Sequence, residues 1–433
     1  MPSFDSLFRT VEHVAPGQHI REYPRATAVP DQTLSIAVKQ YIPIENPNPQ
    51  PGDVTIIGAH ANGFPKELYE PLWEEILIRS RGKFRIRSIW VADAAFQGAS
   101  GVLNEDKLGN DPSWMDPPRD ILHFINLKRE EFPRPIVGVG HSMGGCHLVN
   151  LALMHPRLLH SLVLMDPVIA KPKFTSKPKS FHNFKFNILT TTQASTYRRD
   201  IWPSRKVAAE SFKKSPFYTA WDSRVLDRWI KYGLRDLPTV IHPLPEDAKN
   251  SVEKPVTLTT PKHQEVFTFS RPAYTKEQVT RLTHPDFVPG VTGNYPFYRA
   301  EPGRIFSQLP YLRPSVFWIF GDDSDLSAPE EIEEKLRTTG IAPGGSGGVA
   351  AGRVSHFTFH GIGHMIPMEA VNESAERATN FLDLELKRFK REEETLAMAF
   401  KGKTAVEKVT IDEEWQKHVP KPVRPPKKPK ANI

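Results

Sequence analysis

The chain has 433 residues, of which 39% are hydrophobic and one is a cysteine, and its formal net charge is +7. This composition supplies ample material for a core and excludes global disorder. The single cysteine, Cys146, excludes a disulfide framework and cysteine-rich zinc sites, and it suits a reducing, intracellular compartment.

The positive charge is concentrated in one segment. Residues 417–430, KHVPKPVRPPKKPK, hold six lysines and arginines and no acid, so the rest of the chain carries a net charge of only +1. A nucleic-acid-binding protein shows its basic surface in the folded body, so we expect no nucleic-acid partner. Since no apolar run reaches about 18 residues, we also expect no transmembrane segment.

The first part of the chain alternates strand-like and helix-like patterns. Leu34, Ile36 and Val38 recur at every second position, which predicts a strand over 34–43. By the same patterns we predict strands at 53–60, 84–93, 135–142 and 159–167, and helices at 65–80, 116–130 and 143–156. Alternation of this kind predicts an α/β fold, with a mostly parallel sheet and helices on both faces.

The pattern changes after Pro167. Residues 168–312 are rich in proline, lysine and aromatic residues and lack regular strand spacing, although 202–215 and 220–236 contain amphipathic helices. Strands are predicted again at 314–322 and 354–361, and helices at about 328–338 and 368–394. We therefore expect a core in two parts, 1–167 and 313–400, a cap inserted at 168–312, and a basic, proline-rich tail at 401–433.

One short motif points to chemistry. Residues 140–144, GHSMG, lie between a predicted strand and a predicted helix, which is the context of a nucleophile elbow. Such a turn raises the serine hydroxyl above the end of the sheet, and the helix N-terminus supplies backbone N–H groups. Ser142 is the predicted nucleophile, and the amide of Met143 is a predicted oxyanion donor. The alternative is an ordinary glycine-rich turn between a strand and a helix.

A serine nucleophile needs a base and an acid that orients the base. His364 follows the last predicted strand and precedes the last helix, so we expect it beside Ser142 at the carboxyl edge of the sheet. Two acids qualify. Asp166 ends the strand 159–167, and Asp325 follows the strand 314–322, the usual position of this acid in such sheets. The residues themselves leave both open.

A second oxyanion donor is expected from the loop that follows the strand 53–60. His60 and Gly63 shape this turn, and the amide of Asn62 is the predicted donor. Tyr69 and Trp73, a little further on, are interpreted as core-facing helix residues. The predicted site needs no metal and no cofactor.

Several segments together resemble one known group. They are GHSMGG (140–145), GAHANGFPKELYEPLW (58–73), HIREYP (19–24), NEDKL (104–108) and GIGHMIP (361–367). They resemble the fungal α/β-hydrolases that include yeast peroxisomal lipase, the AK-toxin biosynthesis hydrolase and the mycophenolic acid pathway acyl-CoA hydrolase. The resemblance implies an α/β-hydrolase fold with a large cap and a Ser-His-Asp triad, with the acid at Asp166.

The resemblance also implies a function. We expect hydrolysis of a thioester or ester of a hydrophobic acid, with acyl-CoA hydrolysis in secondary metabolism favoured over a lipase-like activity. A transferase or C–C bond-cleaving enzyme and a non-catalytic binding protein are the alternatives on this fold. Lysines 171, 173, 177 and 179 are candidates to meet the phosphates of CoA. The oligomeric state, a homodimer included, stays open.

The resemblance bears on location as well. Members of the group commonly end in a peroxisomal tripeptide of small, basic and leucine residues. This chain ends in Ala431, Asn432 and Ile433, of which only Ala431 fits that pattern. The resemblance thus suggests the peroxisome, and the terminal residues favour the cytoplasm.

Overall fold

The computed structural model describes residues 4–171 and 188–422. The chain falls into two compact units, Met1–Leu386 and Lys387–Ile433. The second unit contains the end of helix α14 (Val371–Met398) and the short, exposed helix α15 (Glu413–His418). The four-part division expected from the sequence stays a prediction. In the described ranges, no helix combines the length and apolarity needed to cross a membrane.

The first unit is built on an eight-stranded sheet in the order β1-β2-β4-β3-β5-β6-β12-β13. Its strands are β1 (Phe8–Pro16), β2 (Ser35–Pro43), β3 (Val54–Ala59), β4 (Ile86–Ala92), β5 (Ile136–His141), β6 (Ser161–Met165), β12 (Ser315–Gly321) and β13 (Val354–Phe359). The pairs β1–β2 and β2–β4 are antiparallel, and every other neighbouring pair is parallel. The prediction of a mostly parallel sheet is confirmed.

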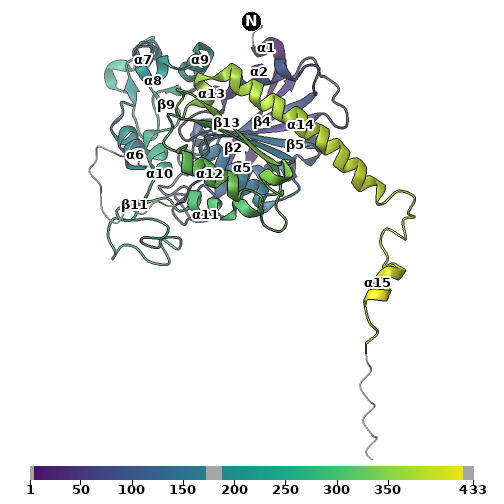
Figure 1. Cartoon of the computed structure of the whole chain (residues 1–433). Helices are drawn as coiled ribbons and strands as arrows, with labels where there is room; N and C mark the ends of the chain where they lie inside the picture. The colour runs from purple at the N-terminus through teal and green to yellow at the C-terminus, as the bar shows by residue number, and fades with distance from the viewer. Residues whose placement is uncertain (1–3, 172–187, 423–433) are drawn as a thin grey trace, which may run out of the picture. The chain divides into compact units, whose positions relative to one another are not determined.

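Helices cover both faces of this sheet (Figure 1). Successive side chains of a strand point to opposite faces, so neighbouring residues of β3 enter different cores. Ile56 packs in the cluster that contains Leu72, and Ile57 in the cluster that contains Leu148. The first face is covered by α2 (Glu70–Ser80) and the start of α14, the second by α4 (Asp116–Leu127), α5 (Met143–Met154) and α11 (Glu301–Gln308).

Some elements differ from their predicted form. The helix expected at 65–80 begins as a 3₁₀ turn, η1 (Lys66–Tyr69), before α2. The helix expected at 368–394 is interrupted at Ala370, between α13 (Ile366–Glu369) and α14. Strand β1 was not predicted, because its exposed and partly exposed residues give no clear apolar alternation. The remaining helices outside the inserted segment are α1 (Phe4–Leu7), α3 (Gly98–Leu103), η2 (Arg129–Glu131), α12 (Pro329–Thr338) and η5 (Val349–Ala351).

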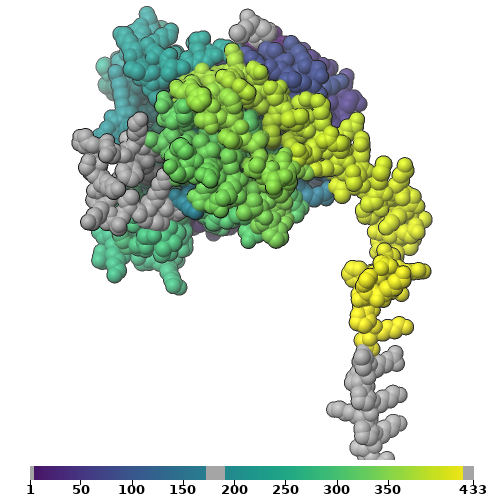
Figure 2. Space-filling model, in the orientation of Figure 1, coloured from purple at the N-terminus to yellow at the C-terminus, as the bar shows by residue number. Residues whose placement is uncertain are grey.

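The segment 168–312 lies between β6 and β12, which are neighbours in the sheet. Its helices are α6 (Ile188–Tyr197), α7 (Arg205–Phe212), α8 (Pro216–Thr219), α9 (Ser223–Tyr232), η3 (Glu246–Ala248), α10 (Lys262–Phe269), α11 and η4 (Leu309–Tyr311). Its strands are β7 (Ile201–Trp202), β8 (Leu234–Asp236), β9 (Val256–Leu258), β10 (Arg271–Pro272) and β11 (Phe297–Tyr298). In Figure 1 the helices α6 to α10 gather on one side of the sheet, and Figure 2 shows their teal atoms at the surface.

The structure adds short strands to this segment and corrects one of its helices. The strands form the small sheets β7-β9-β8 and β10-β11. Each of these strands is two or three residues long, too short for a period of two to show in the sequence. The helix expected at 220–236 ends at Tyr232, and residues 234–236 form β8. Lysines 173, 177 and 179 lie outside the described residues, and Lys171 is paired with Glu334.

Candidate active site

Ser142 lies in a sharp turn between β5 and α5. Its backbone has φ 56° and ψ −120°, a strained conformation for a residue with a side chain. A Cβ atom at Gly144 would collide with the carbonyl oxygen of Ala59, and one at Gly140 would lie 2.8 Å from the carbonyl oxygen of Gly144. Because glycine alone permits these approaches, the turn can pack tightly against β3. This is the geometry of the nucleophile elbow.

Two hydrogen bonds join Ser142 to His364 and Asp166. His364 lies on the loop between β13 and α13, and its Nε2 is 2.7 Å from Ser142 Oγ. Its Nδ1 is 2.5 Å from Asp166 Oδ2. An ionised carboxylate only accepts hydrogen bonds, so Nδ1 carries the proton and Nε2 is left to accept the serine hydroxyl. This is the tautomer that a general base requires.

Asp166 is fully buried directly after β6. The hydroxyl groups of Ser324 and Ser327 donate to its two carboxylate oxygens, each at 2.5 Å. Burial by itself would raise the pKa of Asp166, but the hydrogen bonds and charge of His364, with the two serine hydroxyls, lower that pKa below its usual value. Asp166 is therefore held as an ionised acceptor for His364.

The second predicted acid, Asp325, lies half-buried on the loop between β12 and α12. The same loop carries Ser324 and Ser327, which hold the Asp166 carboxylate. Since Nδ1 of His364 has one proton, the hydrogen bond to Asp166 uses it. The loop at the usual acid position thus holds a carboxylate that comes from the neighbouring strand.

The two predicted oxyanion donors lie in one cavity with Ser142. On either side of Asn62, the amide of Ala61 donates to Tyr69 Oη at 2.8 Å and the amide of Gly63 donates to Gln97 Oε1 at 2.9 Å. Among the described residues, the structure gives no hydrogen-bond acceptor to the amides of Asn62 and Met143. Both N–H groups are therefore available to an oxygen atom of a ligand.

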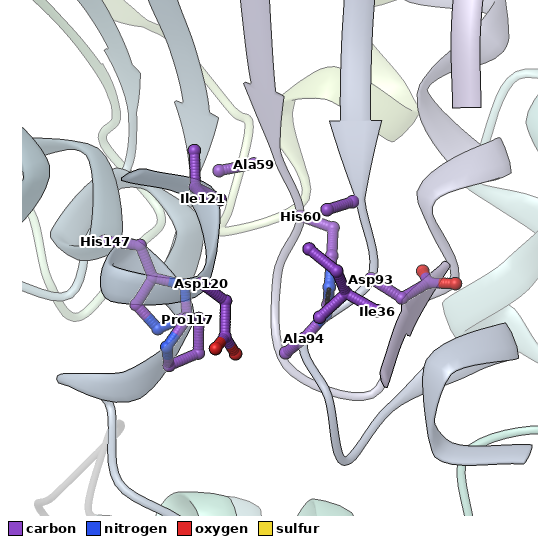
Figure 3. A pocket seen from close by; sticks show the side chains of 10 residues that line it. Ile36, Ala59, His60, Asp93, Ala94, Pro117, Asp120, Ile121 and His147 are labelled. Atoms are coloured by element: carbon purple, nitrogen blue, oxygen red, sulfur yellow. Dashed lines mark hydrogen bonds between the residues drawn. The ribbon is translucent and has the colours of Figure 1, made fainter. Parts of the chain in front are cut away.

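His60 fixes the loop that carries Asn62. Its Nε2 accepts from the amide of Ala94 at 2.9 Å, so its Nδ1 carries the proton and donates to the carbonyl oxygen of Ala61 at 2.8 Å. Burial lowers the pKa of His60, which keeps the ring neutral. Figure 3 shows His60 beside a small cavity of about 10 Å³, across from Asp120 and His147.

A much larger cavity, of about 560 Å³, opens onto Ser142 and His364. This volume is typical of small-molecule sites. Its lining is predominantly apolar and comes from loops of the sheet and from the inserted segment. The larger apolar side chains are Phe64, Trp114, Val168, Phe217, Phe269 and Met365.

One ion pair lies in the wall of this cavity. Arg198 Nη1 is 2.8 Å from Glu265 Oε2, and the hydroxyl of Ser195 donates to Glu265 Oε1 at 2.7 Å. The carbonyl oxygen of Glu265 accepts from the side-chain amide of Asn62 at 3.0 Å. Helix α10, which carries Glu265, is thus bonded to the loop that supplies the predicted oxyanion donor.

The sequence did not indicate the residues that support this site. Tyr69 faces the core, as expected, but its hydroxyl is hydrogen-bonded to Ala61 and to His141. A buried tyrosine hydroxyl usually has a hydrogen-bond partner, so the prediction of Tyr69 as a core residue already implied one. Gln97, Ser324 and Ser327 gave no signal, because their partners lie far away along the chain.

The sheet order, the elbow and the insertion between two neighbouring strands are together those of a hydrolase built on the α/β fold. The chain belongs to the alpha/beta hydrolase family, whose model matches residues 56–369. The predicted fold class is confirmed.

The chain is similar to several fungal proteins. It is 40% identical over 429 residues to the type I acyl-CoA thioesterase mpaH of Penicillium roqueforti (strain FM164), with 95% of each chain covered. It is 41% identical to mpaH' of Penicillium brevicompactum, which bears the same description, with 96% of each chain covered. It is 25% identical to the abhydrolase domain-containing protein AKT2 of Alternaria alternata, over 58% of this chain and 84% of that one.

A solved structure shares the fold. The peroxisomal alpha-beta-hydrolase Lpx1 of Saccharomyces cerevisiae matches with a TM-score of 0.64 and 17% identity, over 88% of this chain and 90% of that one. At this identity the likeness shows the fold alone. The resemblance to the fungal group seen in the sequence is confirmed.

Proposed function

We propose that the protein hydrolyses acyl-CoA thioesters of a hydrophobic acid, with Ser142 as nucleophile, His364 as base and Asp166 as the orienting acid. The observation that carries the proposal is the hydrogen-bonded chain from Ser142 through His364 to Asp166, which opens onto a predominantly apolar cavity. Relatives named acyl-CoA thioesterases, at 40% and 41% identity over nearly the whole chain, favour a thioester substrate.

The first half-reaction forms an acyl-enzyme. Ser142 Oγ attacks the thioester carbonyl carbon while His364 Nε2 takes the hydroxyl proton, and Asp166 stabilises the imidazolium. The amides of Met143 and Asn62 donate to the oxyanion. When the tetrahedral intermediate collapses, the C–S bond breaks, and the CoA sulfur leaves with the proton from His364.

The second half-reaction releases the acid. A water molecule attacks the acyl carbon, and His364 Nε2 takes one of its protons. The ester bond to Ser142 Oγ then breaks, and the serine oxygen receives that proton back from His364. The acid and the free enzyme result, and the same two amides hold the second oxyanion.

The inserted segment 168–312 serves in this proposal as a cap over the acyl group. Phe217 and Phe269 of this segment face the same cavity as Phe64 and Trp114 of the sheet loops. Burial of apolar surface then supplies the binding energy for a hydrophobic acid.

A panel of substrates tests the proposal. We expect kcat/KM to be higher for acyl-CoA thioesters than for matched p-nitrophenyl esters and triacylglycerols, and we expect Ser142→Ala to remove hydrolysis of all of them. Faster turnover of the esters would assign a carboxylesterase or lipase activity to the same triad. Binding of acyl-CoA with no turnover by the wild type would favour a binding protein.

We further propose an intracellular location, which the single cysteine supports. Lpx1, which shares the fold, is described as peroxisomal. A fluorescent tag at the N-terminus leaves the terminal residues 431–433 accessible to an import receptor. Imaging this fusion beside a peroxisomal marker separates the peroxisome from the cytoplasm.

A further inference from the structure

A chain of buried hydrogen bonds links the loop of Asn62 to the loop of His364. The amide of Ala61 donates to Tyr69 Oη at 2.8 Å, and Tyr69 Oη lies 2.9 Å from His141 Nδ1. His141 Nε2 lies 2.8 Å from the carbonyl oxygen of His364. The chain thus runs through Tyr69 and His141, neither of which is among the lining residues of the large cavity.

The two ends of this chain fix the direction of every bond. The carbonyl oxygen of His364 can only accept, so Nε2 of His141 carries the proton and its Nδ1 is an acceptor. Tyr69 must then donate its hydroxyl proton to Nδ1, and its oxygen is left to accept from Ala61. The set is fully satisfied in one arrangement, which makes such a network rigid.

Burial keeps these protonation states unchanged. Tyr69 is 3% exposed and His141 is 1% exposed. Burial, followed by the influence of His364, lowers the pKa of His141 to about 3, so the ring is neutral when the enzyme works near neutral pH. Burial also raises the pKa of Tyr69, which keeps its hydroxyl proton in place.

This series of hydrogen bonds reaches the segments that carry the proposed catalytic groups, but its members take no part in the reaction. Ala61 precedes Asn62, the proposed oxyanion donor, and His141 precedes Ser142. The last bond reaches the backbone of His364 and leaves its ring free to bond Ser142 and Asp166. The hydrogen bonds therefore set where the loops lie, and they leave the proton on His364 untouched.

We propose that Tyr69 and His141 are positioning residues, which hold the loop of Asn62 and the loop of His364 at a fixed distance from each other. The amide of Asn62 can then donate to the acyl oxygen while His364 accepts the proton of Ser142. The inference rests on the proposed function. A small misplacement of catalytic groups lowers the rate strongly, and one oxyanion donor is worth about 10²–10³ in kcat. A merely structural hydrogen bond would instead contribute to stability alone.

Tyr69→Phe tests the proposal, because it deletes only the hydroxyl group. Tyr41→Phe is the matched control: Tyr41 is fully buried among Phe4 and Phe8, and its hydroxyl donates to Glu70 at 3.0 Å. We expect Tyr69→Phe to lower kcat about 10-fold to 100-fold with KM changed less than about twofold. We expect Tyr41→Phe to keep kcat within about twofold, with both variants folded by circular dichroism at the assay temperature.

A double-mutant cycle tests whether the two residues act as one unit. His141→Leu removes both bonds of the ring, and we expect the double variant with Tyr69→Phe to lose no more kcat than the worse single variant. His141→Gln, which keeps a donor and an acceptor, should recover part of the loss. Multiplied losses in the double variant would overturn the proposal, since they would mean independent roles.

The outcomes separate this proposal from the proposed function. Full hydrolysis by Ser142→Ala would overturn both. An inactive Ser142→Ala together with a wild-type kcat in Tyr69→Phe would overturn the positioning role alone. If His141→Leu does not fold, the comparison of Tyr69→Phe with Tyr41→Phe decides the question by itself.

Discussion

The carboxyl edge of the sheet and the inserted segment 168–312 contribute to the site in different ways. At the sheet edge, Ser142 and Asp166 directly follow buried parallel strands, and short hydrogen bonds fix their side chains. The inserted segment is made of short helices and of strands of two or three residues. It reaches the site mainly through side chains that line the cavity and through the carbonyl oxygen of Glu265.

This difference suggests a division of labour. Groups that must be placed within a fraction of an ångström are held by the sheet, where neighbouring strands restrain one another. The cavity proposed for the acyl group is lined in large part by the inserted segment, together with Phe64 and Trp114 of the sheet loops. Variants at the sheet edge should therefore lower kcat for every substrate, whereas variants in the inserted segment should change the order of preference among substrates.

The largest effect is expected at Ser142. Ser142→Ala removes one hydroxyl from a buried turn, so the fold should persist while kcat falls about 10⁴–10⁶-fold on every thioester. Steady-state release of CoA, with circular dichroism as the control for folding, measures this. A kcat within about tenfold of the wild-type value would contradict the role of Ser142 as nucleophile.

The next effect distinguishes the two acids. Asp166→Asn should lower kcat about 10³–10⁴-fold, because an amide at this position favours the wrong tautomer of His364. Asp325→Asn should cost less than about tenfold, and it is the matched control from the neighbouring loop. Measurement of kcat for both variants on one thioester decides the matter. If Asp325→Asn shows the large loss of kcat instead, Asp325 is the orienting acid.

A smaller effect is expected from the serines that hold Asp166. In a variant that carries both Ser324→Ala and Ser327→Ala, the carboxylate loses two donors, which raises the pKa of Asp166 and leaves its orientation toward His364 less fixed. We expect kcat to fall about tenfold, with KM nearly unchanged. An unchanged kcat would mean that burial and His364 alone suffice to hold the acid.

Phe217→Ala tests whether the inserted segment sets the preference among acyl groups. Phe217 lies in the inserted segment and lines the cavity, so its removal makes room for a larger acyl group. We expect the ratio of kcat/KM for a long acyl chain to that for a short one to rise about 5-fold to 10-fold. The kcat on the best substrate should change less than about threefold. A uniform loss across all chain lengths would contradict the division of labour.

A further prediction concerns acid stability. Burial lowers the pKa of His147, on the elbow helix, to about 3. Unfolded histidine takes up a proton below about pH 6.5, so the free energy of unfolding should fall as the pH falls from about 6.5 toward 3. His147→Gln should reduce that slope by about 1.4 kcal/mol per pH unit. Urea unfolding at pH 7, 6 and 5 tests this, and equal slopes in both proteins would contradict it.

The sequence predicted the sheet edge better than the inserted segment, for physical reasons. Ser142 and His364 stand in local patterns, a glycine-framed turn and a loop after the last strand, which the structure brings together. The choice between Asp166 and Asp325 is not local. Strands β6 and β12 are parallel neighbours, with Met165 beside Ile319, so both acids leave the sheet at the same edge. Tertiary hydrogen bonds at Asp166 distinguish them.

The supporting network lay beyond sequence reasoning for a similar reason. Tyr69 and His141 are 72 residues apart, and His141 and His364 are 223 residues apart. A buried tyrosine and a histidine in an elbow are each compatible with many partners. Their roles follow only from the packing of a 3₁₀ turn, a strand end and a loop against one another.

The proposed function depends on the claim that Ser142 is a nucleophile activated by His364 and Asp166. Reaction with a fluorophosphonate, followed by digestion and peptide mass spectrometry, tests this role, because the reagent modifies an activated serine hydroxyl. We predict one adduct, on the peptide that contains Ser142, slower labelling in Asp166→Asn, and no labelling in Ser142→Ala. An adduct on another residue, or labelling that persists in Ser142→Ala, would contradict the claim.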